Sequence, residues 1–147
     1  MQKLVPPILF LLCLVVMFIL NSIFPIDYWL KSPLNLLGIL PIMIGFLSLF
    51  TTLNQYRKIR TEINTFKQPN KLITNGFFKY SRNPIYLGFT LVLLDAATLF
   101  GNVAAIIPVV FFFLLSNFWY IPFEEKNLEK FFGDSYLTYK SHVRRWI

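Results

Sequence analysis

IYLGFTLVLLDAATLFGNVAAIIPVVFFFLLSNFWYI, residues 85–121, is the part of this chain of 147 residues from which its fold is most directly predicted. It consists of two apolar runs, 85–100 and 103–121, in which Asp95 is the one charged residue. Only Gly101 and Asn102 separate the two runs. Such a short link predicts a tight antiparallel helical hairpin, in which the start of the first helix lies beside the end of the second.

Two further apolar runs precede this stretch, at residues 4–24 and 34–53. The first is 21 residues long and uncharged, so at about 1.5 Å per residue it spans roughly 30 Å, the thickness of a hydrocarbon core. The composition agrees, because 56% of the residues are hydrophobic, 14% are charged and the mean hydropathy is +0.58. We therefore expect an all-α integral membrane protein with four transmembrane helices, and we exclude a soluble domain. A cleavable signal peptide is the alternative for the first run, but no Ala-x-Ala-like site follows it.

Basic residues are distributed unequally among the segments that join these runs. Of the 14 Lys and Arg residues, seven lie in segment 54–83, five follow residue 121, Lys3 precedes the first run and only Lys31 lies between the first two runs. Because basic segments stay in the cytoplasm, four helices with both termini cytoplasmic fit this distribution. An anionic membrane surface then accounts for the net charge of +7, and no nucleic-acid partner is expected.

We expect the chain to have three parts. Residues 1–53 hold transmembrane helices 1 and 2, in which Gly38 and Gly45 favour close helix approach. Residues 54–83 form a basic cytoplasmic connector, in which the apolar spacing of Leu53, Tyr56 and Ile59 predicts either an extension of the second helix or a separate amphipathic helix at the interface; a solvated basic linker is the alternative. Residues 84–147 form the hairpin and an amphipathic helical tail and, with the end of the connector, the catalytic region. One cysteine, Cys13, and one histidine, His142, make no disulfide framework or Cys/His metal cluster, so we expect no metal.

A positively charged site is predicted where the third helix begins. Asparagine is a frequent N-cap and proline suits the first helical position, so Asn83 and Pro84 mark the start of this helix. Free N–H groups of the first turn, the positive end of the helix dipole and the guanidinium of Arg82 then converge into an anion site. In the alternative interpretation, Arg82 reaches lipid phosphate and Tyr86 belongs to the aromatic belt of the membrane.

Two adjacent glutamates follow the hairpin. We expect the fourth helix to end at Pro122, and an amphipathic tail helix to carry the pair. Glu124 shares the apolar stripe of Leu128 and Phe131, while Glu125 lies about 100° around the helix, so at most one of the two is expected to point fully into a site. A carboxylate at the membrane boundary is unfavourable unless it meets a cation. Pairing within the helix or compensation of its dipole is the alternative.

Four motifs follow one another in the second half of the chain: Arg82-Asn83-Pro84-Ile85-Tyr86, Glu124-Glu125, Phe132-Gly133-Asp134-Ser135-Tyr136-Leu137-Thr138-Tyr139 and Val143-Arg144-Arg145. In this order and spacing they resemble the isoprenylcysteine carboxyl methyltransferase family of integral membrane enzymes, which is related to the phospholipid N-methyltransferases. The resemblance covers roughly residues 71–147. Asn83 stands where that family usually has histidine, and Arg144 stands where it usually has proline.

The resemblance implies S-adenosylmethionine as the cofactor and a lipid-like or prenylated methyl acceptor in the bilayer. The cofactor lies among helix ends in this interpretation, because the six glycines form no Gly-x-Gly-x-x-Gly motif. Three residues are implied to lie near the reacting groups, namely Arg82, Glu124 and Glu125. The implied cofactor-binding residues are Tyr80, Asn83, Pro84, Tyr86, Glu124, Glu125, Tyr136 and Tyr139.

Carboxyl O-methylation is the reaction that we expect, with Arg82 orienting the acceptor carboxylate. A carboxylate with a pKa of about 4 is already ionised at neutral pH, so it needs orientation and desolvation but no general base. Phospholipid or amine N-methylation is the alternative, in which a glutamate takes a proton. Two other functions stay open: a four-helix transporter that uses Asp95, and a membrane reductase with a nicotinamide cofactor.

Overall fold

The computed structural model describes residues 5–24, 39–59 and 71–147. These residues form helices and no strand, which confirms the expectation of an all-helical chain. Lys31, Gly38 and the middle of the predicted connector lie outside the described residues. The elements, in chain order, are α1 Pro6–Ile23, α2 Ile39–Ile59, the 3-10 turn η2 Gly76–Lys79, α3 Pro84–Phe100, the 3-10 turn η3 Val103–Ala105, α4 Ile106–Leu115, the π-helical turn η4 Ser116–Tyr120, α5 Ile121–Phe132 and α6 Asp134–His142.

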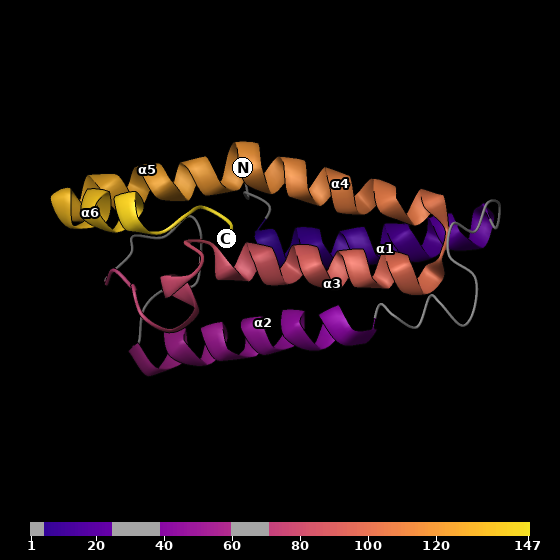
Figure 1. Ribbon diagram of the computed structural model, residues 1–147. Helices are drawn as coiled ribbons and strands as arrows, with labels where there is room; N and C mark the ends of the chain where they lie inside the picture. The colour runs from indigo at the N-terminus through magenta and orange to yellow at the C-terminus, as the bar shows by residue number, and fades with distance from the viewer. Residues whose placement is uncertain (1–4, 25–38, 60–70) are drawn as a thin grey trace.

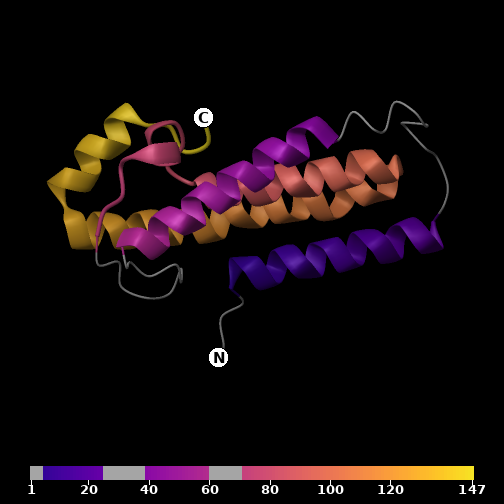
Figure 2. The same cartoon turned by 90° about the horizontal axis from the view of Figure 1, so that it is seen from below.

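The helices form an elongated bundle in which successive helices run in opposite directions. α1 and α3 start at one end of the bundle, and α2 and α4 start at the other (Figure 1). α2 packs along one side of α3, whereas α1 lies on another side, against α3 and α4 (Figure 2). α5 continues α4 beyond the bundle, and α6 turns back beside α5. The start of α3, the end of α2 and the C-terminus therefore gather at one end.

Among the described residues, two helical stretches are long and apolar enough to cross a membrane, Pro6–Ile23 and Val103–Phe132, and their most apolar windows have mean hydropathies of 2.4 and 2.0. A third apolar helix, Pro84–Phe100, is shorter. α1 directs large apolar side chains outward, and Phe18, for example, is 63% exposed. A helix covered by outward apolar side chains suits lipid better than water. These helices support the membrane character that the composition predicts.

α3 begins and ends where the sequence predicts. Pro84 occupies the first turn, where its missing N–H needs no partner. Gly101 ends the helix with a φ of 66°, a conformation that glycine adopts without strain. Asn83 precedes the helix, but its side chain makes no capping hydrogen bond. Its amide donates instead to the carbonyl oxygen of Arg145 at 3.0 Å, so a tertiary contact replaces the expected cap.

α2 and α3 approach closely at two facing glycines. A Cβ atom on Gly88 would lie 2.7 Å from Leu49 Cγ, and one on Gly45 would lie 3.0 Å from Val92 Cγ2. Both distances are too short for a side chain to be added without movement of its neighbours. The sequence predicts close approach at Gly45, whereas Gly88 was not singled out.

The helix that begins with α4 does not end at Pro122, contrary to the expectation from sequence. It continues through η4 into α5, which ends at Phe132. The N–H of Ile121 donates to the carbonyl oxygen of Ser116, one residue further back than in an α-helix. This wider turn accommodates Pro122, because proline has no N–H to donate and its ring crowds the preceding turn. The two glutamates thus project from one continuous helix.

Two apolar clusters hold the elements together. The larger cluster lies between α1, α3 and α4, and Met17, Leu93 and Phe112 are fully buried within it. The smaller cluster joins the end of the connector to α6, and its buried members are Ile73, Phe78, Tyr136 and Tyr139. Because the smaller cluster packs around the residues that precede α3, it fixes the backbone next to Arg82.

Candidate active site

Three charged residues meet where α3 begins and α5 leaves the bundle. Nη2 of Arg82 lies 3.2 Å from Oε1 of Glu125. Nε and Nη2 of Arg145 donate to Oε1 and Oε2 of the same carboxylate, at 3.1 and 2.7 Å. Glu125 is buried. One buried carboxylate is therefore shared by two guanidinium groups, and the three residues together carry a net positive charge.

One N–H donor of the Arg82 guanidinium makes no hydrogen bond within the described residues. Its Nη1 donates to the hydroxyl of Tyr136 at 3.4 Å, whereas its Nε is buried and has no acceptor among the described residues. A buried donor without an acceptor is unfavourable by roughly 1–3 kcal/mol, and more for a charged group. Nε of Arg82 is thus a buried donor that lacks an acceptor among the described residues, and a carboxylate makes the strongest bond with a guanidinium.

Two tyrosines of α6 lie beside this cluster. Burial raises the pKa of Tyr136 to about 12, and the charge of Glu125 adds to the rise while Arg82 opposes it. The hydroxyl of Tyr139 donates to the carbonyl oxygen of Phe78 at 2.7 Å, and burial also raises the pKa of Tyr139. Both phenols therefore stay uncharged at neutral pH and act as neutral hydrogen-bonding groups.

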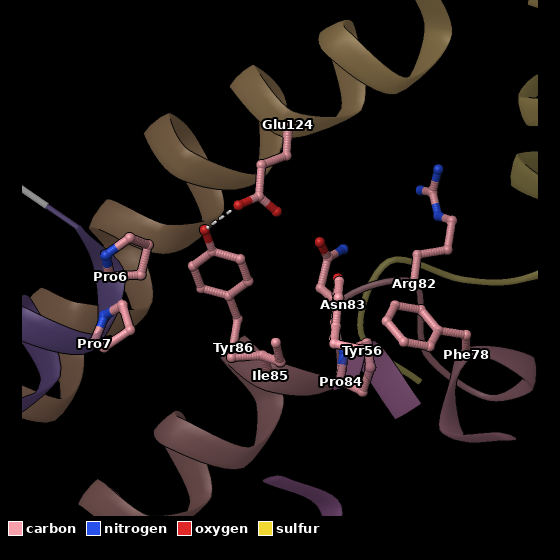
Figure 3. Close-up of a pocket in the computed structure, with 10 residues that line it drawn as sticks. All are labelled: Pro6, Pro7, Tyr56, Phe78, Arg82, Asn83, Pro84, Ile85, Tyr86 and Glu124. Atoms are coloured by element: carbon pink, nitrogen blue, oxygen red, sulfur yellow. Dashed lines mark hydrogen bonds between the residues drawn. The ribbon is translucent and has the colours of Figure 1, made fainter. Parts of the chain in front are cut away.

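A first cavity of about 50 Å³ lies where the starts of α1 and α3 meet α5. The hydroxyl of Tyr86 donates to Oε1 of Glu124 at 2.8 Å, and Figure 3 shows this pair between the prolines of α1 and the side chain of Asn83. The cavity thus combines a carboxylate, a guanidinium and an apolar wall. Its lining residues are Pro6, Pro7, Tyr56, Phe78, Arg82, Asn83, Pro84, Ile85, Tyr86 and Glu124.

A second cavity of about 70 Å³ extends from the same residues toward α6. Arg82 and Asn83 line both cavities, with Glu124 in the first and Glu125 in the second. A ligand group in either cavity therefore meets both signs of charge. The second cavity is lined by Tyr56, Lys71, Leu72, Ile73, Phe78, Arg82, Asn83, Glu125, Leu128, Tyr136 and Tyr139.

Most of the site residues predicted from sequence lie together around these cavities. Tyr80 is 71% exposed and lines neither cavity, and its predicted contact with a cofactor stays a prediction. The predicted residues that line one or both cavities are Arg82, Asn83, Pro84, Tyr86, Glu124, Glu125, Tyr136 and Tyr139.

Both glutamates reach the site, although helical spacing predicts at most one. Glu125 shares the inner face of α5 with Leu128, whereas Phe131, expected on the apolar stripe, is 43% exposed. Glu124 faces the first cavity. The physical reason is that α5 has partners on two sides, the start of α3 on one and α6 on the other, so positions about 100° apart both find polar contacts.

Other lining and contact residues were not predicted. For Arg145, its place in the terminal motif Val143-Arg144-Arg145 is the signal available in the sequence. Tyr56 belongs to the apolar spacing that extends α2, and that spacing predicts packing but gives no sign that Tyr56 lines a cavity. No signal pointed to Pro6 and Pro7, because their contribution depends on how α1 packs.

Comparison with known proteins gives matches to methyltransferases. The model of the phospholipid methyltransferase family matches residues 34–135. An uncharacterized protein of Haemophilus influenzae is 43% identical over 63 residues, which cover 43% of this chain and 100% of that protein. The protein-S-isoprenylcysteine O-methyltransferase of Schizosaccharomyces pombe is 38% identical over 74 residues, and that of Saccharomyces cerevisiae is 30% identical over 139 residues. No solved structure gives a significant match.

The chain matches only part of the yeast enzymes. The two yeast alignments include 49% and 89% of this chain, but only 30% and 56% of the respective enzymes. The region matched by the family model contains Arg82, Glu124 and Glu125. These relatives confirm the resemblance that the motifs predict.

Proposed function

The chain belongs to the phospholipid methyltransferase family, and on that premise we propose that it transfers a methyl group from S-adenosylmethionine to a lipophilic acceptor at the membrane interface. The observation that carries the proposal is Arg82, whose buried Nε has no acceptor among the described residues. Arg82 borders two cavities, and each of them also holds a glutamate. In this proposal residues 84–147 form the catalytic part together with the end of the connector.

The residues around the cavities suit the charges of S-adenosylmethionine, which carries a carboxylate, an ammonium and a sulfonium. When bound, this cofactor supplies the electrophilic methyl group. Glu125 already balances two guanidinium groups, so we assign the positive groups of the cofactor to Glu124, which faces the first cavity.

The acceptor that this arrangement suits best is a carboxylate attached to a lipid chain. Nε of Arg82 holds the carboxylate, and the apolar wall of the first cavity removes water from it. No base is required, because a carboxylate is ionised at neutral pH. Holding the reacting groups in line can contribute roughly 7–11 kcal/mol. The two yeast relatives are named for O-methylation of isoprenylcysteine, which supports O-methylation here.

N-methylation of a phospholipid or another amine is the second candidate, and the description of the family favours it. An amine must lose a proton before or during methyl transfer. Glu124, which accepts a hydrogen bond from Tyr86 at 2.8 Å, is the carboxylate placed to take that proton. The two candidates differ in the charge of the acceptor, so a carboxylate and an amine acceptor of equal chain length separate them.

We further propose four membrane-spanning helices with both termini in the cytoplasm. The alternating directions of α1 to α4 (Figure 1) and the unequal distribution of basic residues support this topology. It brings the site to the cytoplasmic end of the bundle. A transporter would require a charged pathway through the membrane, whereas both cavities lie at the bundle end and neither is lined by Asp95.

The proposal is tested by titrating the purified chain in nanodiscs with S-adenosylmethionine, S-adenosylhomocysteine and NADPH, using calorimetry. We expect the first two to bind and NADPH not to bind. Arg144→Ala removes an exposed arginine next to the site, so as a control it should bind the three compounds as the wild type does. A folded chain that binds only NADPH, or none of the three, would overturn the methyltransferase proposal.

A further inference from the structure

Residues 143–147 pack against the residues that precede α3, and we call them the C-terminal strap. The backbone N–H of Arg82 donates to the carbonyl oxygen of Arg144 at 3.0 Å. The carbonyl oxygen of Arg145 accepts from Asn83 Nδ2 at 3.0 Å and from Ser81 Oγ at 3.3 Å. The backbone of the strap is therefore bound to the residues that immediately precede α3.

Trp146 anchors the strap to the long helix that carries the glutamates. Its indole Nε1 donates to Oδ1 of Asn117 at 3.0 Å. Its ring stacks on Phe113 with a centroid separation of 5.0 Å. Asn117 lies in the wide turn η4, whose altered register sets the direction of its side chain. Arg145 is thus held between two anchors and has little freedom to move.

The two guanidinium groups on Glu125 bind it unequally. Arg145 uses both carboxylate oxygens, whereas Arg82 makes a single contact of 3.2 Å through Nη2. A bidentate guanidinium–carboxylate pair is the stronger arrangement. Without Arg145, the buried carboxylate would have spare acceptor capacity facing Arg82. Arg82 would then turn its own fork, Nε included, toward Glu125 and away from the ligand.

We propose that Arg145 is a positioning residue, which occupies both oxygens of Glu125 and so keeps Nε of Arg82 available for the carboxylate of the acceptor. This inference rests on the proposed function, in which Arg82 binds that carboxylate. Arg145 lines neither cavity, so it acts through Glu125 and not by touching the ligand. The hydrogen bonds to Glu125 also raise the pKa of Arg145, so its charge persists at any working pH.

The test measures how well the chain distinguishes a carboxylate from its ester. N-acetyl-S-farnesylcysteine and its methyl ester are titrated into nanodiscs that contain the wild type. The signal from empty nanodiscs is subtracted, because both compounds also partition into lipid. The ratio of the two dissociation constants reports the contact with Arg82, because the ester lacks the charge. We expect Arg145→Ala to reduce this ratio about tenfold, the size of one lost charge-assisted hydrogen bond. Arg144→Ala, which removes a neighbouring exposed arginine, should leave it unchanged.

A second substitution distinguishes competition from simple damage to the fold. If Glu125 captures Arg82 when Arg145 is absent, then Glu125→Gln added to Arg145→Ala should restore most of the ratio. Independent structural roles would make the two losses add. A wild-type ratio in Arg145→Ala, or additive losses in the double variant, would overturn the proposal.

If Arg145→Ala does not fold, Arg145→Lys is measured in its place. Lysine keeps the charge but cannot form two parallel hydrogen bonds, so we expect an intermediate ratio and partial recovery with added guanidinium ion. An unchanged ratio in Arg145→Lys would count against positioning by a fork. Methyl transfer by the wild type is measured first, so that failure of the proposed function is seen separately from failure of this inference.

Discussion

Glu124 and Glu125 are neighbours in sequence but lie in different surroundings. Glu124 accepts a hydrogen bond from Tyr86 and lines the first cavity. Glu125 is buried between Arg82 and Arg145. A buried carboxylate with two cations stabilises local structure, whereas a carboxylate at a cavity wall is available to a ligand. The two residues should therefore differ in what their substitution affects.

We predict that Glu124→Gln lowers methyl transfer by at least about tenfold and leaves the melting temperature nearly unchanged, because the glutamine is isosteric but carries no charge for the cofactor. Glu125→Gln should instead lower stability, by about 1–3 kcal/mol, because two buried guanidinium groups lose their counter-charge. Activity and thermal unfolding of both variants in the same detergent provide the measurement. Equal effects of the two variants on both readouts would contradict this division.

Arg82→Lys tests whether Arg82 orients a carboxylate or only contacts lipid phosphate. Lysine keeps a positive charge at the interface, so a lipid anchor would tolerate it. It cannot offer a planar fork, so an orienting role predicts that the rate falls much more than the stability does. Arg144→Lys is the control for the charge-preserving change at an exposed site. Full activity in Arg82→Lys would assign Arg82 to the membrane surface.

At the scale of elements, the turn η4 and the glycine contact between α2 and α3 set the shape of the site. η4 carries the helix past Pro122 and so brings the glutamates to the start of α3. Gly88 lets α2 pack against the first turns of α3. Because Arg82 directly precedes α3, the position of this helix determines the position of its guanidinium.

Gly88→Ala should destabilise the chain although alanine is the better helix former. The new Cβ would lie 2.7 Å from Leu49 Cγ and 3.2 Å from the carbonyl oxygen of Gly45, and such overpacking costs about 1–3 kcal/mol. Thermal unfolding of Gly88→Ala in the wild type and in a Leu49→Ala background measures the effect. The loss of stability caused by Gly88→Ala should be smaller in the Leu49→Ala background, where the Leu49 side chain no longer occupies the space. An equal loss of stability in both backgrounds would exclude this contact as the cause.

In the molecule as a whole, the bundle brings the described ends of the basic connector and the site to the same end. The start of α3, the end of α2 and the C-terminus gather there (Figure 1). The other end holds the short link between α3 and α4, where Asn102 is buried and Val103 is 49% exposed. The proposed topology puts the first end in the cytoplasm and the second outside.

Cysteine labelling from outside intact cells tests this topology. In a Cys13→Ala background, we expect a membrane-impermeant maleimide to modify Val103→Cys but not Ile147→Cys, because only the first position faces the exterior. Ile147 is 72% exposed, so permeabilised cells should show that it reacts once reached. Val103 is chosen because the neighbouring Asn102 is too buried to label. Modification of Ile147→Cys in intact cells would reverse the proposed orientation.

The helical class, the bounds of α3 and about half of the residues that line the cavities follow from sequence patterns alone. Local rules suffice for these: apolar length predicts membrane helices, and Pro84 and Gly101 mark where a helix can begin and end. Motif spacing predicted that Arg82 and the glutamates lie close together, and they do so although the glutamates project from the middle of a continuous helix and not from its end. These properties depend on contacts between residues close in the chain, which sequence patterns record directly.

Only the tertiary structure decided the partners of each charge and the direction of each glutamate. The end predicted at Pro122 was wrong because a single wide turn, which no local pattern reveals, let the helix continue. Arg145 reaches Glu125 across 20 residues, and the amide of Asn83 binds the strap 62 residues away. The acceptor of a buried donor depends on how distant elements pack and on the energy of pairing buried charges. Neither can be derived from a short segment of the sequence.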